Sequence, residues 1–461
     1  MRFRAEWLIR GWAILPALLL LALPGSVAAA GLWVTGYYPG YEQASLPPTS
    51  IDFSVVTHVI QFSIMPNADG TVSRANGLTS AYSSALVSRA HSAGRMALIC
   101  VGGGGSQTAF QAATATAVRP TFINSLTNFM ATNSYDGIDL DWEPLPASDF
   151  GQFTNLVKEL RAALDRFPQH KLLTVAAGAY SNYGDPANAE SLMYAGIQSR
   201  LDQINLVTYD LSGPWPGWVT WFNSPLYDGG YRFPSTGGLV PSVDGAIANF
   251  LANGVAATKL GVGVAFYGYS WSGGSGTSTG GAALPRQSWS TAPTSTAITY
   301  ATIMSTYYQS NLYHWDSSAQ AAYLSIDNSG STNDKFISYD DRHTCQVKVS
   351  YARNRFLGGL MIWELGQDYG ANSLLQELKQ DLATPGSLSV QLTNQDVSLS
   401  FTSIPLALYR VTWTTNLTAG PWNTLTNNVA GSPDGLSRVW VSDPGALHSS
   451  RARYYRAQTP P

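Results

Sequence analysis

The chain has 461 residues, more than one ordinary domain accommodates, and carries 26 Lys plus Arg against 29 Asp plus Glu. This near balance of charge gives no indication of nucleic-acid binding or of attachment to an anionic membrane. Aromatic content is high, with 14 Trp and 24 Tyr. Such rings either fill a core or stack against sugar faces, and composition leaves both uses open.

The first thirty residues have the pattern of an export signal. Three arginines within the first ten residues precede an apolar run from Trp12 to Leu23, and small residues follow up to Ala30. A membrane anchor is the alternative, but the apolar run is short for a span. We expect cleavage near Ala30 and a secreted mature chain, extracellular or periplasmic, that is monomeric and does not contact a membrane.

Alternating strand and helix patterns run from residue 32 to about 382, which is typical of a parallel α/β sheet. Eight strands are predicted, and apolar stripes predict outer helices at 150–164 and 243–253. The number of strands predicts a (β/α)8 TIM barrel. The predicted strands are 32–38, 56–63, 96–102, 137–142, 172–177, 203–209, 260–265 and 359–363.

The two cysteines fall within this barrel region. Cys100 lies on the third predicted strand and Cys345 on a late outer helix. Although an exported protein can form disulfides, we expect both thiols to be buried and unpaired.

A long stretch at about 270–340, after the seventh strand, predicts a small α+β insertion, because a structureless loop of that length is unusual in a compact domain. The catalytic barrel is therefore expected at 31–383, followed by a linker at 384–387. Residues 388–461 alternate polar and apolar side chains, which predicts a C-terminal all-β sandwich-like domain. For its Trp413, Trp422 and Trp440 we favour core packing over a sugar-binding face.

The most unusual stretch is 136–143, where four acids recur within an apolar run. On a β-strand, Asp139, Asp141 and Glu143 share one face. Carboxylates held that close raise the pKa of at least one of them, which can then act as a general acid near neutral pH. From spacing alone, an acidic strand end in solvent and an oxygen-ligand site for a hard cation stay open.

This stretch closely resembles the DxxDxDxE signature of family 18 glycoside hydrolases, the chitinase family. Further segments are similar to the family in the same order, across about residues 31 to 382. The chain departs at Tyr269, where the family usually has Arg, and at Cys100, where Ser is usual. The similar segments are 206–210, 223–227, 259–271, 338–341 and 358–364.

The resemblance implies a chitinase that hydrolyses β-1,4 bonds between N-acetylglucosamine units with retention of configuration and assistance from the substrate's acetamido group. It implies that Glu143 is the general acid/base and that Asp141 orients the acetamido group and stabilises an oxazolinium intermediate. Asp139 would share a proton with Asp141, and Tyr209 would donate its hydroxyl to the acetamido oxygen. Asp136 is expected to be structural.

Substrate-binding roles are expected for five further residues: Asp210, Trp363, Tyr267, Trp215 and Tyr37. The expected partner is chitin or N-acetylglucosamine oligosaccharides, with no nucleic acid, metal or cofactor. Alternatives on the same site are an endo-β-N-acetylglucosaminidase acting on N-glycans, or a hydrolase of peptidoglycan. A non-catalytic chitin-binding lectin is a further alternative, although such lectins usually lack the acid that Glu143 provides.

Overall fold

The computed structural model describes residues 32–179, 189–328 and 330–383. Of the C-terminal region it describes 389–393, 396–401, 408–415, 421–430, 439–444, 446 and 453–458. The export signal and the linker expected at 384–387 lie outside the described residues. Within the described residues, none of the helices has the length and hydropathy that crossing a membrane would need.

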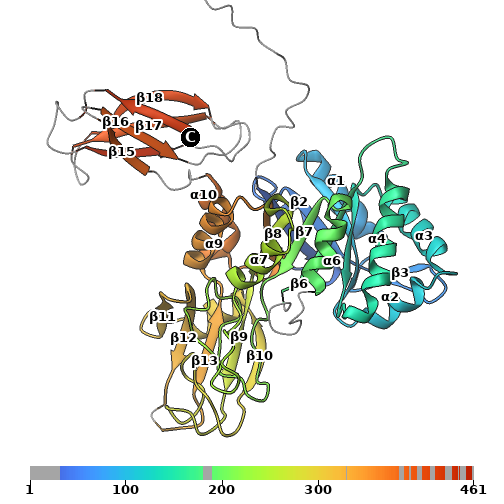
Figure 1. Cartoon of the computed structure of the whole chain (residues 1–461), viewed down its shortest axis with the longest axis horizontal. Helices are drawn as coiled ribbons and strands as arrows, with labels where there is room; N and C mark the ends of the chain where they lie inside the picture. Colours follow the sequence, from blue (N-terminus) through green and yellow to red (C-terminus); the bar gives the residue numbers. More distant parts are fainter. Residues whose placement is uncertain are drawn as a thin grey trace, which may run out of the picture.

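Eight parallel strands form a closed barrel (Figure 1), which confirms the predicted (β/α)8 fold. The first strand, β1, pairs with both β2 and β14, and this double pairing closes the sheet. A short strand, β3 (Val72–Arg74), adds to β2 in antiparallel orientation. The barrel strands are β1 (Trp33–Pro39), β2 (His58–Pro66), β4 (Met96–Gly103), β5 (Gly137–Trp142), β6 (Leu172–Gly178), β7 (Gln203–Val207), β8 (Leu260–Ala265) and β14 (Gly359–Trp363).

Helices cover the outside of the barrel and bury their apolar stripes against it. The helix predicted at 150–164 is α4 (Phe150–Leu164), which buries Phe153, Leu156 and Leu160. Ser242 caps α7 (Val243–Ala252) by accepting a hydrogen bond from the Gly245 N–H. The other outer helices are α1 (Ser80–Ser92), α2 (Gln107–Ala113), α3 (Arg119–Thr132), α6 (Ala189–Ile197), α9 (Arg342–Asn354) and α10 (Leu374–Ala383).

The insertion between β8 and β14 is mainly a five-stranded antiparallel sheet, which extends away from the barrel in Figure 1. Its first strand begins at Tyr267, three residues before the expected start, and a short helical segment covers 300–307. The strand order is β10-β9-β13-β12-β11. The strands are β9 (Tyr267–Ser272), β10 (Thr294–Thr299), β11 (Tyr313–Asp316), β12 (Ala321–Ile326) and β13 (Lys335–Tyr339).

A second core joins this sheet to the long connection between β7 and α7. Trp221 and Phe222 of the connection are fully buried in a cluster with Trp271 and Phe336 of the sheet. The side chain of Asn223, next in the chain, accepts a hydrogen bond from the Asp210 N–H at 2.8 Å. The connection is therefore a packed part of the insertion, and it is tied to the carboxyl end of β7.

The C-terminal region contains two three-stranded antiparallel sheets, as the sandwich prediction requires. Aliphatic and smaller aromatic side chains, such as Leu399 and Tyr409, fill the core between them. One sheet is β15 (Ser389–Thr393), β16 (Asp396–Phe401) and β19 (Val439–Asp443). The other is β18 (Asn423–Ala430), β17 (Leu408–Thr414) and β20 (Tyr454–Gln458).

Core packing was the wrong prediction for the three tryptophans of this region. Trp440 is 55% exposed, and neither Trp413 nor Trp422 belongs to the core cluster. Arginine guanidinium groups instead lie over the rings of these last two, Arg453 over Trp413 and Arg456 over Trp422. Strand alternation explains the outcome for Trp440, because its neighbours Val439 and Val441 take the inward positions.

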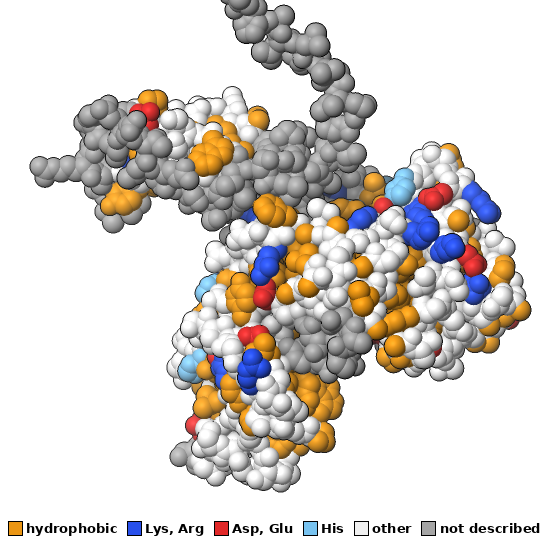
Figure 2. All heavy atoms as spheres, viewed as in Figure 1, with side chains coloured by type: hydrophobic (Ala, Val, Ile, Leu, Met, Phe, Trp, Pro, Cys, Tyr) orange, Lys and Arg blue, Asp and Glu red, His pale blue; other side chains and the backbone are white. Residues whose placement is uncertain are grey.

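Figure 2 shows that charged side chains are sparse on this face of the described surface, where uncharged polar and apolar groups dominate. Cys100 on β4 and Cys345 on α9 are both free and buried, which confirms the prediction of unpaired thiols.

Candidate active site

The acidic stretch forms β5 and the residue that follows it. Ile138, Leu140 and Trp142 point outward into the main core, where the Trp142 ring stacks on Phe110 of α2 at 4.7 Å. The alternate residues point into the barrel, so the predicted row of acids on one face is observed. Because the row ends at the carboxyl end of β5, it opens where barrel active sites are built.

Asp139 lies deepest and is fully buried. The Tyr37 hydroxyl of β1 donates to its Oδ2 at 2.8 Å, and the Thr174 hydroxyl of β6 donates to its Oδ1 at 2.5 Å. Burial raises the pKa of Asp139 to about 6, although these two hydrogen bonds favour the ionised form. Asp139 therefore changes its protonation state close to neutral pH.

Asp141 lies between Asp139 and Glu143 and is 5% exposed. Burial raises its pKa well above the usual range, and the negative charges of Glu143 and Asp139 raise it further. The Cys100 Sγ lies 4.0 Å from Asp141 Oδ2, so a thiol contacts this carboxyl at the position where the family usually has Ser. These surroundings favour the protonated form of the Asp141 carboxyl.

Glu143 follows β5 and is half-buried at the rim of the barrel. Its backbone N–H donates to Ser106 Oγ at 3.1 Å, and the Ser106 hydroxyl donates to the Asp141 carbonyl, which fixes the end of the strand. Gly104 borders the carboxyl, since a Cβ there would lie 3.7 Å from Glu143 Oε2. Burial raises the pKa of Glu143, an effect that its interaction with Asp141 partly offsets.

Tyr209 lies two residues beyond β7, not on the strand as predicted, and is 5% exposed. Its hydroxyl donates to the Met361 sulfur of β14 at 3.3 Å. A thioether is a weak acceptor, so the hydroxyl can turn to a better acceptor that enters the site. Burial raises its pKa strongly, and the charge of Glu143 contributes next, which keeps the phenol protonated as a donor.

Asp210 follows with a left-handed backbone, at φ 56°. The Tyr267 hydroxyl of β9 donates to its Oδ1 at 2.5 Å, and Tyr269 also hydrogen-bonds to it. Burial raises the pKa of Asp210, and the two phenols oppose that rise. Where the family usually has Arg, a neutral phenol thus contacts this carboxyl.

Trp363, the last residue of β14, is half-buried between other rings. It meets Phe62 edge-on at 4.9 Å and Tyr37 at 5.4 Å. The indole therefore has a fixed position at the carboxyl end of the barrel, and its predicted contact with substrate stays a prediction. Tyr37 itself is 1% exposed with its hydroxyl on Asp139. The strand directs the Tyr37 ring inward beside Asp139 and Trp363, and the substrate contact expected of it stays a prediction.

Trp215 is 43% exposed and lies on the connection between β7 and α7. Its ring folds back over the backbone of Gly213, where a Cβ would lie 2.6 Å from the indole. The structure thus brings Glu143, Asp141, Asp139 and Tyr209 together, with Asp210 and Tyr267 as their neighbours. Trp215 lies at the surface, where its ring contacts Trp218.

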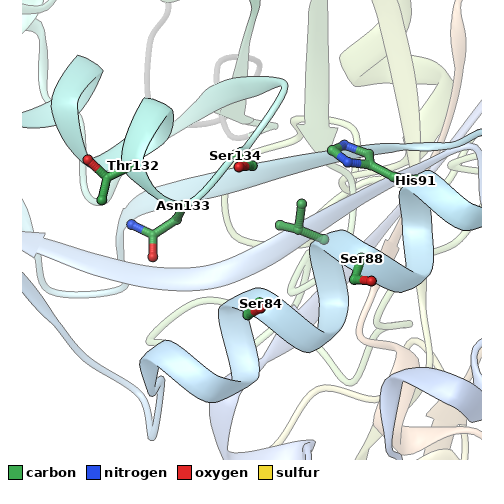
Figure 3. A pocket seen from close by; sticks show the side chains of 7 residues that line it. Ser84, Ser88, His91, Thr132, Asn133 and Ser134 are labelled. Carbon is green, nitrogen blue, oxygen red and sulfur yellow. The ribbon is translucent and has the colours of Figure 1, made fainter.

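Asp136 is remote from this cluster, at the other end of β5. Its Oδ2 accepts the Ala97 N–H and contacts His91 Nε2, both at 2.8 Å. A pocket of about 320 Å³ lies nearby between α1 and α3 (Figure 3), lined mainly by hydroxyl and amide groups such as those of Ser88 and Asn133. It lies at the amino ends of the strands, so Asp136 supports the fold there.

Thr174 and Met361 are neighbours of the site that were not predicted from the sequence. Thr174 pairs in register with Asp139 across β5 and β6, so both side chains point into the barrel. The inward phase of the fifth predicted strand, 172–177, was the available signal for it. Met361 falls within the segment 358–364 that resembles the family, but no role near the site was predicted for it. Among the described residues, no group of three or more His, Cys, Asp or Glu side chains is arranged to hold a metal ion.

Comparisons with known proteins agree with this geometry. Residues 34–368 match the family model described as glycosyl hydrolases family 18. The chain is 32% identical to chitinase A1 of Niallia circulans over 72% of its own length and 48% of the relative, about half of that protein. It is 30% identical to a class V chitinase of Arabidopsis thaliana, over 76% of this chain and 89% of the relative.

A solved family 18 N-acetylglucosaminidase from Paenibacillus barengoltzii has the same fold, with a TM-score of 0.63 and 25% identity. The similarity covers 76% of this chain and 99% of that one. The family model covers most of the chain, and the row of acids lies at the carboxyl end of the barrel. The chain therefore belongs to family 18 of the glycoside hydrolases.

Proposed function

We propose that this protein is a chitinase that hydrolyses β-1,4 bonds between N-acetylglucosamine units and retains the configuration at the anomeric carbon. The observation that carries the proposal is the row on β5, in which buried Asp139 and Asp141 lead to the more accessible Glu143. Such a row supplies one carboxyl that can reach a glycosidic oxygen and a second that remains beside it.

Glu143 supplies the proton for the leaving group. Burial raises its pKa, so a fraction of the carboxyl stays protonated where an exposed glutamate would be ionised. As the C–O bond breaks, the leaving oxygen takes this proton, and the carbonyl oxygen of the substrate's own acetamido group attacks the anomeric carbon. The resulting Glu143 carboxylate then accepts a proton from the incoming water, which opens the oxazolinium ring.

Asp141 orients the acetamido group for that attack. Its carboxyl can accept the acetamido N–H, and its negative charge stabilises the positive charge that develops on the oxazolinium ring. Asp141 must lose a proton to carry this negative charge. Asp139 supports that ionisation, because its pKa of about 6 allows it to hold the proton that Asp141 gives up. Tyr37 and Thr174 hold Asp139 in place from the neighbouring strands.

Tyr209 and Trp363 complete the subsite. Among the described residues, the Tyr209 hydroxyl donates to a thioether sulfur, a weak acceptor, so it is available to donate to the acetamido oxygen as that oxygen becomes the nucleophile. The Trp363 indole gives an apolar surface for a sugar face. Asp210, Tyr267 and Trp215 are assigned to contacts with neighbouring parts of the substrate.

The test is product release from colloidal chitin and from soluble N-acetylglucosamine oligomers, compared with cellulose and fully deacetylated chitosan. Short acetylated products should form from the first two substrates only, since the nucleophile belongs to the acetamido group. Efficient cleavage of cellulose or of deacetylated chitosan would contradict a substrate-assisted mechanism.

A second candidate is an N-acetylglucosaminidase, because one solved structure similar to this chain carries that name. Both candidates need the acetamido group, so the choice of substrate does not distinguish them. The sizes of the products do. Release of single N-acetylglucosamine units alone from hexamers would favour the glucosaminidase, and dimers or longer products would favour the chitinase. An N-glycan substrate in the same panel tests the endo-acting alternative.

We also infer that the mature enzyme is exported, on the basis of the arginines and the apolar run in its first thirty residues. Amino-terminal sequencing of the chain recovered outside the cytoplasm should begin near Gly31. Recovery of the uncleaved chain in a membrane fraction would instead favour an anchor.

A further inference from the structure

A group of polar side chains lies inside the barrel, below the acids of β5 and toward the amino ends of the strands. Thr35 of β1 and Gln203 of β7 are each 1% exposed, and Asn205 of β7 is fully buried. Among the described residues, four atoms of this group have no hydrogen-bond partner: Thr35 Oγ1, Gln203 Nε2, Asn205 Nδ2 and Asn205 Oδ1. Buried polar groups are almost always hydrogen-bonded, either to protein or to ordered water. These atoms therefore require a partner that can both donate and accept.

Gln203 and Asn205 border one small space above the backbone of Gly261 on β8. A Cβ added to Gly261 would lie 2.6 Å from Asn205 Oδ1 and 3.0 Å from Gln203 Nε2. An acceptor and a donor thus lie beside the same space, and they do not bond to each other. A water molecule can donate to the first and accept from the second. Glycine at position 261 leaves the two amides in place, because a larger side chain would collide with both.

The strand register brings Asp139 to the edge of this space. Thr174 of β6 pairs in register with Asp139 on one side and with Gln203 on the other. Asn205 pairs with Ala176, the next inward position of β6. The strands of such a barrel tilt, so that alternate strands contribute inward side chains to one layer. Asp139 of β5 and Asn205 of β7 therefore share a layer of the barrel interior.

Thr174 connects the space to the deepest acid of the row. Its hydroxyl donates to Asp139 Oδ1 at 2.5 Å. A hydroxyl has one proton to donate and lone pairs that can accept, so Thr174 Oγ1 can accept from a water molecule beside Gln203. This second hydrogen bond keeps the Thr174 proton directed at Asp139. Hydrogen bonds arranged in such a chain also strengthen one another.

We propose that ordered water molecules occupy the barrel interior below Asp139, bound by Thr35, Gln203 and Asn205, and that they hold the Thr174 hydroxyl as a donor to Asp139. The ligand is water, because the space offers neutral donors and acceptors and no charged side chain. Asn205 is a positioning residue, which acts on Asp139 through water and Thr174. The effect on turnover rests on the proposed function, whereas the water site itself does not.

Several titratable groups face Asp139 and set the background for this effect. Tyr37 of β1 and Cys100 of β4 hydrogen-bond to it, and Asp141 of β5 repels its charge. Glu143 and Tyr209 lie above Asp141. Among the described groups, hydrogen bonds and not cations favour the ionised form of Asp139. The neighbouring inward positions that do not titrate are Ile60, Thr174, Asn205, Gly261 and Met361.

The pH dependence of kcat/KM on a soluble N-acetylglucosamine oligomer tests the role of the water. Asn205→Leu keeps a side chain of similar size and removes both polar atoms. The donation from Thr174 then weakens and the pKa of Asp139 rises, so the acidic limb should move to higher pH by about 0.5. Asn205→Ser retains a hydroxyl and leaves room for a further water molecule, so its acidic limb should lie within about 0.2 of the wild-type position.

Tyr194→Phe is the matched control. The Tyr194 hydroxyl is also buried without a partner among the described residues, but it packs among the outer helices. This variant should leave the acidic limb in place. Coincident limbs for Asn205→Leu and wild type would overturn the proposal. Equal displacement in Asn205→Leu and Asn205→Ser would also overturn it, because lost packing would then explain the effect.

A high-resolution crystal structure of the wild type tests the water site without any variant. Ordered water should lie about 3 Å from Asn205 Oδ1 and from Gln203 Nε2. Direct protein hydrogen bonds to the Asn205 amide, with no water beside it, would overturn the proposal. This measurement is independent of turnover. Ordered water in a chain that hydrolyses no N-acetylglucosamine oligomer would support the water site and overturn the proposed function alone.

Discussion

The Tyr37 hydroxyl and Asp139 Oδ2 lie 2.8 Å apart, although 102 positions separate these residues in the chain. The contact joins β1 to β5 across the interior of the barrel. With the Thr174 hydroxyl on the other oxygen, it leaves both Asp139 oxygens hydrogen-bonded to fixed donors. The deepest acid of the row is therefore held in a fixed position. The two hydrogen bonds also favour the ionised form of its carboxyl.

Tyr37→Phe should shift the pH dependence of turnover. The hydrogen bond from Tyr37 favours the ionised form of Asp139, whose pKa burial has raised to about 6. Without this donor the pKa of Asp139 rises further, so the acidic limb of kcat/KM should move to higher pH by about one unit. Tyr38→Phe is the control, because that hydroxyl donates to the Leu46 carbonyl instead. Coincident acidic limbs for Tyr37→Phe and the control would contradict this role.

Tyr209→Phe should lower kcat by about a hundredfold and change KM little, because the hydroxyl acts on the acetamido oxygen mainly as that oxygen attacks. Steady-state rates on a soluble oligomer measure the effect. Tyr194→Phe serves as the control, since this tyrosine is equally buried but packs among the outer helices. If the two variants lose the same amount of activity, a packing effect explains Tyr209 better.

The barrel and the acidic row could be predicted from the sequence because both depend on short-range periodicity. Strand alternation placed Asp139 and Asp141 on one face before their surroundings were known. The donors to Asp139 could not be found this way, since they depend on the register of strands far apart in the chain. The core around Trp221 and Trp271 was also missed, because it joins an irregular connection to a sheet that follows it.

Glu364 offers a test of the electrostatics outside the acidic row. Burial raises its pKa from 4.5 to about 8. Between these values the folded chain keeps a proton that the unfolded chain has released, so the free energy of unfolding falls as pH rises. Ionisation of Glu364 therefore lowers the free energy of unfolding by at most about 5 kcal/mol.

Glu364→Gln should remove that contribution. Urea unfolding of this variant and of wild type at pH 5 and pH 9 should show that the variant loses less stability on going to pH 9, by about 2–5 kcal/mol. Glu159→Gln on the surface of α4 is the control. Parallel pH dependence of wild type and Glu364→Gln would refute the buried, protonated state of this side chain.

The Lys348 ammonium on α9 is fully buried, 2.6 Å from an Asp340 carboxylate oxygen. It also donates to the Ser224 hydroxyl oxygen and to the Gly263 carbonyl. Lys348→Met leaves the Asp340 charge without its counterion in the interior, and should reduce the free energy of unfolding by about 3–5 kcal/mol. Urea denaturation at pH 7 measures it.

Arg342→Gln provides the comparison. Arg342 lies on the same helix as Lys348 with half of its side chain exposed, and it pairs with Glu377 of α10. Exposed pairs contribute about 0–1 kcal/mol. A loss of this small size for Lys348→Met as well would mean that the buried pair does not hold α9 to the barrel.

Glu143→Gln tests the central claim most directly. The amide keeps the size and hydrogen-bonding capacity of the side chain but cannot transfer a proton, so kcat on an N-acetylglucosamine oligomer should fall by about a hundredfold to ten-thousandfold. Oligomer binding, measured by calorimetry on the same preparation, should persist within about threefold of the wild-type KM. Turnover by Glu143→Gln at a rate near that of wild type would contradict the assignment of Glu143 as the general acid and, with it, the proposed mechanism.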